Sequence, residues 1–126
     1  MEKVLVTGAT GYIGLHCIQQ LLDQGYAVNG SVRSPERKNE IYEALKKNNT
    51  DTTNLNIFKF DLNDDDGWDE GMEGCDFLIH VASPIALESQ SEDFFVKPAV
   101  AGVKRALKFA QKHSVKKVVL TSSVAA

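Results

Sequence analysis

Three glycines near the N-terminus have the spacing of a phosphate-binding turn. Gly8, Gly11 and Gly14 follow one another at intervals of three residues. A turn without side chains lets the backbone approach a phosphate, and a helix that begins there offers unpaired N–H groups at its positive end. The pattern predicts a dinucleotide pyrophosphate site, and a tight turn in some other α/β protein is the alternative. Gly8, Gly11 and Gly14 are expected to hold the pyrophosphate. The residues of this segment expected to bind the cofactor are Thr7, Gly8, Thr10, Gly11, Tyr12, Ile13 and Gly14.

A basic residue follows the second predicted strand, where NAD sites usually carry a carboxylate. That carboxylate accepts a hydrogen bond from the ribose 2′-OH and would repel a 2′-phosphate. The segment 30–33 has no acidic residue and ends on Arg33, whose planar guanidinium suits a phosphate. The position therefore favours NADP(H) over NAD(H), with Arg37 or Lys38 as possible additional cations. A solvated arginine at a helix start is the alternative.

Short apolar runs that are rich in β-branched residues alternate with helical patterns along the whole chain. We predict strands at 4–6, 27–32, 55–60, 77–81 and 118–121, and helices at 12–24, 35–47, 64–72 and 92–113. Gly25 should end the first helix, Ser34 and Pro35 should begin the second, Ser91 should cap the fourth, and Pro98 should kink or break it. The alternation predicts a three-layer α/β fold with a parallel sheet in the order 3-2-1-4-5.

Two further groups of residues lie where predicted strands end, and ligands of open α/β sheets bind at that edge. Val81, Ala82 and Ser83 end the fourth strand and should line the ribose and nicotinamide path. Asp61 follows the third strand, where it could also cap the next helix.

Composition excludes several classes of protein. The 126 residues are enough for one domain, 1–126, and the net charge of −3 argues against nucleic-acid binding. No segment approaches the roughly 18 apolar residues that a membrane span needs. Cys17 and Cys75 lie far apart, so we expect reduced thiols and a cytoplasmic protein. The spacing of His16, His80 and His113 suits no metal site, and His80 is expected to be a satisfied core histidine.

The motifs together resemble the extended short-chain dehydrogenase/reductase family, within the NAD-dependent epimerase/dehydratase superfamily. The segment 6–14 is similar to its glycine motif, and dihydroflavonol-reductase-like and cinnamoyl-CoA-reductase-like members carry segments similar to 31–35, 61–62, 80–84 and 120–123. The resemblance covers the whole chain. It implies an NAD(P)-binding Rossmann fold, cut before the C-terminal strands and the substrate lobe.

The resemblance also implies roles for individual residues. Asp61 and Leu62 would contact the adenine, and Ser123, with Thr121 as its neighbour, would hold the reacting oxygen of a substrate. The family's Tyr-x-x-x-Lys pair belongs downstream of that serine, and the chain ends at Ala126 before any such pair. Tyr42 and Lys46 have that spacing, but they lie on the second predicted helix and are interpreted as part of its amphipathic surface.

These implications lead to three functional hypotheses. The first is an NADP(H)-dependent oxidoreductase, monomeric or homodimeric, that acts on a carbonyl or secondary alcohol of a small molecule, with this chain as its cofactor-binding part. The second is a nucleotide-sugar epimerase or dehydratase that uses bound NAD. The third is a non-catalytic NADP-binding module, because the chain alone lacks the expected tyrosine and lysine, which leaves its status as an enzyme open.

Overall fold

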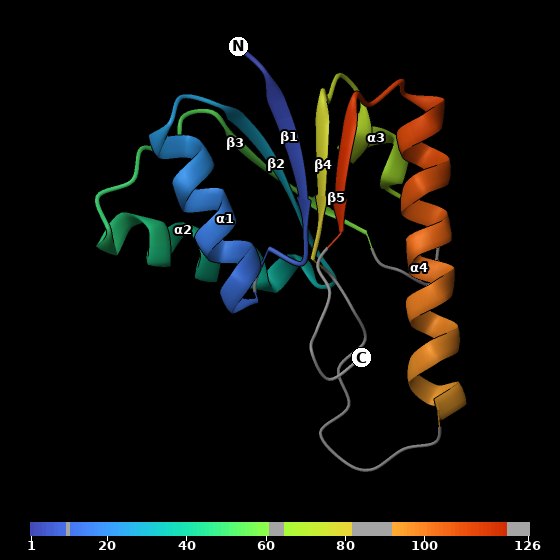
Figure 1. The fold of residues 1–126 in the computed structure, drawn as a ribbon. Coiled ribbons are helices and arrows are strands. Elements are labelled where there is room, and N and C mark those ends of the chain that lie inside the picture. Colours follow the sequence, from blue (N-terminus) through green and yellow to red (C-terminus); the bar gives the residue numbers. More distant parts are fainter. Residues whose placement is uncertain (10, 61–64, 82–91, 121–126) are drawn as a thin grey trace.

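Five parallel strands form one sheet in the predicted order, β3-β2-β1-β4-β5 (Figure 1). The computed structural model describes residues 1–9, 11–60, 65–81 and 92–120, with the side chains of the last range from 101 onward. The strands are β1 (Lys3–Thr7), β2 (Ala27–Val32), β3 (Leu55–Lys59), β4 (Phe77–His80) and β5 (Lys117–Leu120). The central strand β1 pairs with β2, the next strand in the chain, and with the distant β4.

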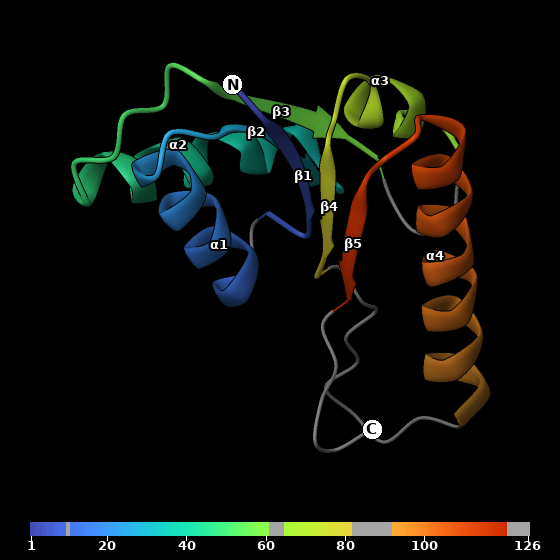
Figure 2. The same cartoon turned by 45° about the horizontal axis from the view of Figure 1, so that its top comes forward.

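Helices cover both faces of this sheet, which gives the predicted three layers. Figures 1 and 2 show α1 (Tyr12–Asp23) and α2 (Lys38–Lys47) on one face and α3 (Trp68–Met72) and α4 (Glu92–Lys112) on the other. No helix in the described part of the chain is long and apolar enough to span a bilayer.

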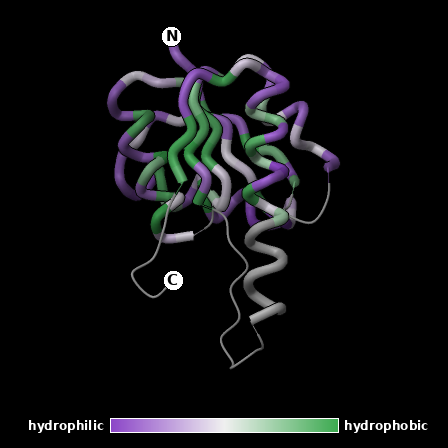
Figure 3. The backbone as a smooth tube through the Cα atoms, turned by 45° about the vertical axis from the view of Figure 1, so that its right-hand side comes forward, coloured by the Kyte–Doolittle hydropathy of each residue, from purple (hydrophilic) through white to green (hydrophobic). Residues whose placement is uncertain are grey.

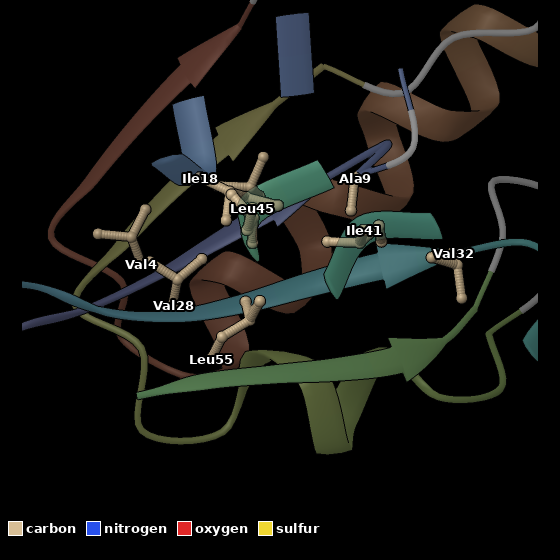
Figure 4. Close-up of a cluster of buried hydrophobic side chains, with 9 residues drawn as sticks. Val4, Ala9, Ile18, Val28, Val32, Ile41, Leu45 and Leu55 are labelled. Carbon is tan, nitrogen blue, oxygen red and sulfur yellow. The ribbon is translucent and has the colours of Figure 1, made fainter. Parts of the chain in front are cut away.

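Each face of the sheet has its own hydrophobic core. Figure 4 shows the core beneath α1 and α2, where Ile18, Ile41 and Leu45 pack on side chains of β1, β2 and β3. The core beneath α3 and α4 is built around Trp68, which is fully buried and stacks on Phe109 with ring centroids 5.8 Å apart. The strands are accordingly the most hydrophobic part of the backbone tube in Figure 3.

Three helix predictions differ from the structure. The helix expected from residue 64 begins at Trp68, because Gly67 has a φ of +88°, a left-handed conformation that an α-helix does not continue through. The helix expected over 35–47 starts as a short 3₁₀ turn, Pro35–Arg37, before α2. Of the kink or break expected at Pro98, the break does not occur, since α4 is continuous from Glu92 to Lys112. Later turns of the helix pack in the core through Ala106, Phe109 and Ala110.

Candidate functional site

The glycine turn joins β1 to α1 through a closely packed backbone. Gly8 has a φ of +73°, and the Gly11 N–H donates to the Gly8 carbonyl oxygen at 3.1 Å. A β-carbon at Gly14 would overlap that same carbonyl oxygen. Gly8 therefore supplies the conformation of the turn, and Gly14 allows α1 to lie directly against it.

Strand β2 binds the glycine turn through two hydrogen bonds to Ser31. The Ser31 carbonyl oxygen accepts the Ala9 N–H at 2.9 Å, and the Ser31 hydroxyl accepts the Gly8 N–H at 3.1 Å. The side chain of Ser31 is buried, and its bond to the Gly8 N–H is partly buried. The two hydrogen bonds fix the turn next to the end of β2, two residues before Arg33.

The N-terminus of α1 is open to solvent. Gly11 caps the helix without any side-chain hydrogen bond, and Gly11, Tyr12 and Ile13 are all exposed, Tyr12 at 80% and Ile13 at 54%. The first N–H groups of a helix have no partner within it and carry its positive partial charge. The residues present therefore fit a phosphate ligand at this end of α1.

Two cations that follow β2 have no anionic partner among the described residues. Arg33 and Lys38 are exposed, and neither takes part in an ion pair in that part of the chain. Arg37 is different, because its guanidinium contacts the Glu40 carboxylate at 3.3 Å. Arg33 is therefore better placed than Arg37 to bind an added phosphate.

The ends of β1 and β4 are joined by a buried hydrogen-bonded group. The Val81 N–H donates to the Thr7 hydroxyl oxygen at 2.9 Å, and a second bond of 2.9 Å joins that oxygen to Nδ1 of His80. Burial lowers the pKa of His80 below its usual range, which favours the neutral imidazole. The prediction of a satisfied core histidine at position 80 is confirmed.

Several predicted site residues lie outside the described residues. These are Thr10, Asp61, Leu62, Ala82, Ser83, Thr121 and Ser123, together with the cap residue Ser91. The structure places the others along the carboxyl edge of the sheet: the glycine turn and Val81 lie there, with Arg33 and Lys38 following β2. Thr7 is buried under the turn, with 1% of its surface exposed.

The Tyr42 and Lys46 pair is part of an ordinary helix surface. Tyr42 is half-buried on α2 and donates from its hydroxyl to the Leu55 carbonyl oxygen at 3.3 Å, whereas Lys46 is exposed. Among the described residues, no group of three histidine, cysteine or acidic side chains could hold a metal ion.

Residue-by-residue reasoning missed the role of Ser31 and the bond between Thr7 and His80. Each hydroxyl lies at or next to the last residue of its strand, which is a usable signal. Their partners depend on which strands are neighbours, and Thr7 and His80 are 73 residues apart in sequence.

Two relatives of this chain by sequence are plant reductases. The chain is 41% identical to anthocyanidin reductase of Arabidopsis thaliana over 99% of this chain, and 37% identical to dihydroflavonol 4-reductase of Dianthus caryophyllus over 97%. It spans 37% of the first protein's length and 34% of the second's.

Solved structures of reductases share its fold. Yeast methylglyoxal/isovaleraldehyde reductase complexed with NADPH superposes with a TM-score of 0.83 and 33% identity, covering 98% of this chain and 38% of that one. Vestitone reductase from alfalfa superposes with a TM-score of 0.80 and 31% identity, covering all of this chain and 37% of that one. The model of the NAD dependent epimerase/dehydratase family matches residues 4–126. The chain therefore belongs to the NAD dependent epimerase/dehydratase family, among relatives of the dihydroflavonol and anthocyanidin reductase kind.

Proposed function

We propose that this chain is the NADP(H)-binding part of a reductase that transfers hydride between the nicotinamide and a carbonyl or secondary alcohol of a small molecule. The observation that carries the proposal is Arg33, an exposed cation without an ion-pair partner among the described residues, two residues beyond the serine that anchors the glycine turn. Two relatives of known structure bear reductase names, and one of them was solved with NADPH.

In this proposal, different residues of the chain bind different parts of the cofactor. Gly8, Gly11 and Gly14 let the first turn of α1 approach the pyrophosphate, and its N–H groups donate to the phosphate oxygens. Arg33 binds the 2′-phosphate through its guanidinium, with Lys38 as a second cation. Asp61 and Leu62 contact the adenine.

The substrate end of the site follows β4 and β5. His80 pairs with Leu120 in the sheet register, so the chain leaves both strands at the same edge. We place the backbone of 81–83 along the ribose and nicotinamide, and Ser123, with Thr121 beside it, at the reacting oxygen. The bound nicotinamide supplies or accepts the hydride. The hydroxyl of Ser123 orients the substrate oxygen. That oxygen is bound to the carbon that gains or loses the hydride.

An epimerase or dehydratase with tightly held NAD is the competing function within the family. Such a site would gain from a carboxylate at the end of β2, which accepts the ribose 2′-OH. This chain has Arg33 at that position, and a surface arginine offers NAD no comparable partner. We therefore favour the reductase.

The test compares the two cofactors. The purified chain is titrated with NADPH and with NADH at one stated ionic strength, and the change in nicotinamide fluorescence is followed. Charged hydrogen bonds contribute about 1.5–3 kcal/mol, which corresponds to a preference for NADPH of about ten- to a hundredfold. The change Arg33→Asp should remove that preference.

Arg37→Asp is the matched control, because Arg37 already pairs with Glu40. It makes the same change of charge in the same segment and should leave the ratio of the two dissociation constants within about twofold, since exposed pairs contribute little. Equal affinity of the unmodified chain for both cofactors, or an equal effect of both substitutions, would overturn the assignment of the 2′-phosphate to Arg33.

A further inference from the structure

Three buried polar side chains form a row under the carboxyl edge of the sheet. They are Ser31 on β2, Thr7 on β1 and His80 on β4, with exposed fractions of 4%, 1% and 5%. The ring of His80 lies 6.5 Å from that of Trp68, which belongs to the core beneath α3 and α4. The row therefore lies inside the protein, next to the backbone of Gly8 and Val81, the first residues after β1 and β4.

The hydroxyls in this row share one geometric role. The Ser31 hydroxyl holds the N–H of Gly8, the first residue after β1. The Thr7 hydroxyl holds the N–H of Val81, the first residue after β4. Each loop of the candidate site thus begins with its first amide bound to a hydroxyl on the neighbouring strand.

His80 is hydrogen-bonded to the Thr7 hydroxyl, which binds the first amide after β4. The 2.9 Å contact between its Nδ1 and Thr7 Oγ1 fixes the rotamer of a threonine that lies between two loops. Packing alone does not require this arrangement, since a valine at 7 and a phenylalanine at 80 would fill similar space without buried polar atoms. Buried polar groups are costly unless they are hydrogen-bonded.

We propose that Thr7 and His80 are positioning residues for the dinucleotide: their hydrogen bond sets the separation between the glycine turn, which holds the pyrophosphate, and the backbone at Val81, which lies along the ribose and nicotinamide. The inference rests on the proposed function and deepens it. Binding sites require their contacting groups to be held to within about 0.5 Å, so a looser strand end weakens a ligand that must touch both loops at once. A ligand that touches only the Arg33 end is unaffected.

The experiment uses two ligands of different reach. NADPH spans both loops, whereas adenosine 2′-monophosphate carries only the adenosine and the 2′-phosphate. Thr7→Val and His80→Phe remove the polar atoms and keep similar volume. Each should weaken NADPH about tenfold and leave the dissociation constant of adenosine 2′-monophosphate within about twofold. Thr7→Ser and His80→Asn keep a hydrogen-bonding atom near its original place and should recover most of the affinity for NADPH.

The matched control is a second buried threonine far from the site. Thr50 follows α2, and its hydroxyl is buried without a hydrogen-bond partner among the described residues. Thr50→Val makes the same chemical change as Thr7→Val and should leave the affinity for NADPH unchanged. The double variant Thr7→Val with His80→Phe should bind NADPH no more weakly than Thr7→Val alone, because the bond that His80→Phe removes is already lost with the Thr7 hydroxyl.

The possible outcomes separate the two proposals. If the unmodified chain binds neither ligand, the proposed function fails. If it binds both, and Thr7→Val and His80→Phe lower the melting temperature while leaving NADPH affinity intact, the two residues only pack and the inference is overturned. An equal loss of affinity for NADPH and for adenosine 2′-monophosphate also overturns the inference. Where a variant fails to fold, amide exchange in the unmodified chain decides: NADPH must slow exchange at both Gly8 and Val81, and a failure to do so counts against the inference.

Discussion

Gly14 and Gly8 lie in contact through their backbones: a β-carbon on Gly14 would overlap the Gly8 carbonyl oxygen and stand 2.9 Å from its carbonyl carbon. Both atoms belong to the backbone, so a methyl group at position 14 would require the turn or the start of α1 to shift. We predict that Gly14→Ala destabilises the protein by about 3 kcal/mol or more, the range of severe backbone and packing conflicts. Urea unfolding followed by circular dichroism measures this, and a loss below about 1 kcal/mol would show that the turn can relax.

Gly11→Ala is the informative contrast within the same motif. Gly11 has an extended conformation that any residue adopts, and an added β-carbon would meet the Gly8 carbonyl oxygen at an ordinary 3.5 Å. We expect the free energy of unfolding to change by less than about 0.5 kcal/mol. The new methyl group would nonetheless stand where the proposed pyrophosphate approaches, so NADPH affinity should fall about tenfold or more. Unchanged affinity would place the phosphates elsewhere.

Asn29 joins the sheet to α3 through a buried amide. Its Nδ2 donates to the Gly71 carbonyl oxygen at 2.8 Å, and its side chain is 2% exposed. Asn29→Asp replaces the donor with an acceptor that faces another acceptor, and should cost about 3–5 kcal/mol at pH 7, as for an uncompensated buried charge. Burial raises the pKa of the new carboxyl, so the loss should shrink as the pH falls and the group takes up its proton. Unfolding at pH 7 and pH 5 tests this. A loss that does not depend on pH would contradict it.

The two cysteines should differ in reactivity. Cys75 is buried, and burial raises the pKa of its thiol to about 11, whereas Cys17 is half-buried on α1. Because the thiolate is the reactive form, Cys75 should remain unmodified by iodoacetamide at pH 8 until the protein unfolds. Mass spectrometry measures the fraction of Cys75 that is labelled in the native protein and in the urea-unfolded protein. Rapid native labelling of Cys75 would show that the layer beneath α3 opens readily.

Acid should weaken the attachment of α3 to α4. A hydrogen bond from Lys112 and another from His113 lower the pKa of Asp69, and one from Arg105 lowers that of Asp65. Their contribution to stability is therefore complete above the unfolded-state value of about 3.9 and is lost as the pH falls through the lowered values. Asp69→Asn should reduce stability at neutral pH and flatten its decline in acid. Asp23→Asn is the control, since Asp23 forms no ion pair within the described residues, and an identical acid profile for both variants would contradict the prediction.

The order of the strands could be predicted because several local signals agree. The glycine turn fixes one β-turn-α unit, and regular alternation of apolar runs with helical patterns leaves few topologies for a parallel sheet. The start of α3 could not be predicted, since it depends on the left-handed conformation of Gly67. The hydrogen bond between Thr7 and His80 could not be predicted from a local sequence pattern either, because tertiary structure alone brings the two residues together.

The strand at the centre of the sheet is synthesised before the other four described strands, and this affects how they can fold on the ribosome. The buried residues of the core beneath α1 and α2 all come from 4–55, so β1, β2 and β3 can assemble around them early. The other side of β1 stays open until β4 (Phe77–His80) has emerged from the exit tunnel. During that interval a nascent chain presents an unpaired parallel edge that other strands can join, and slow translation between β3 and β4 would prolong the exposure.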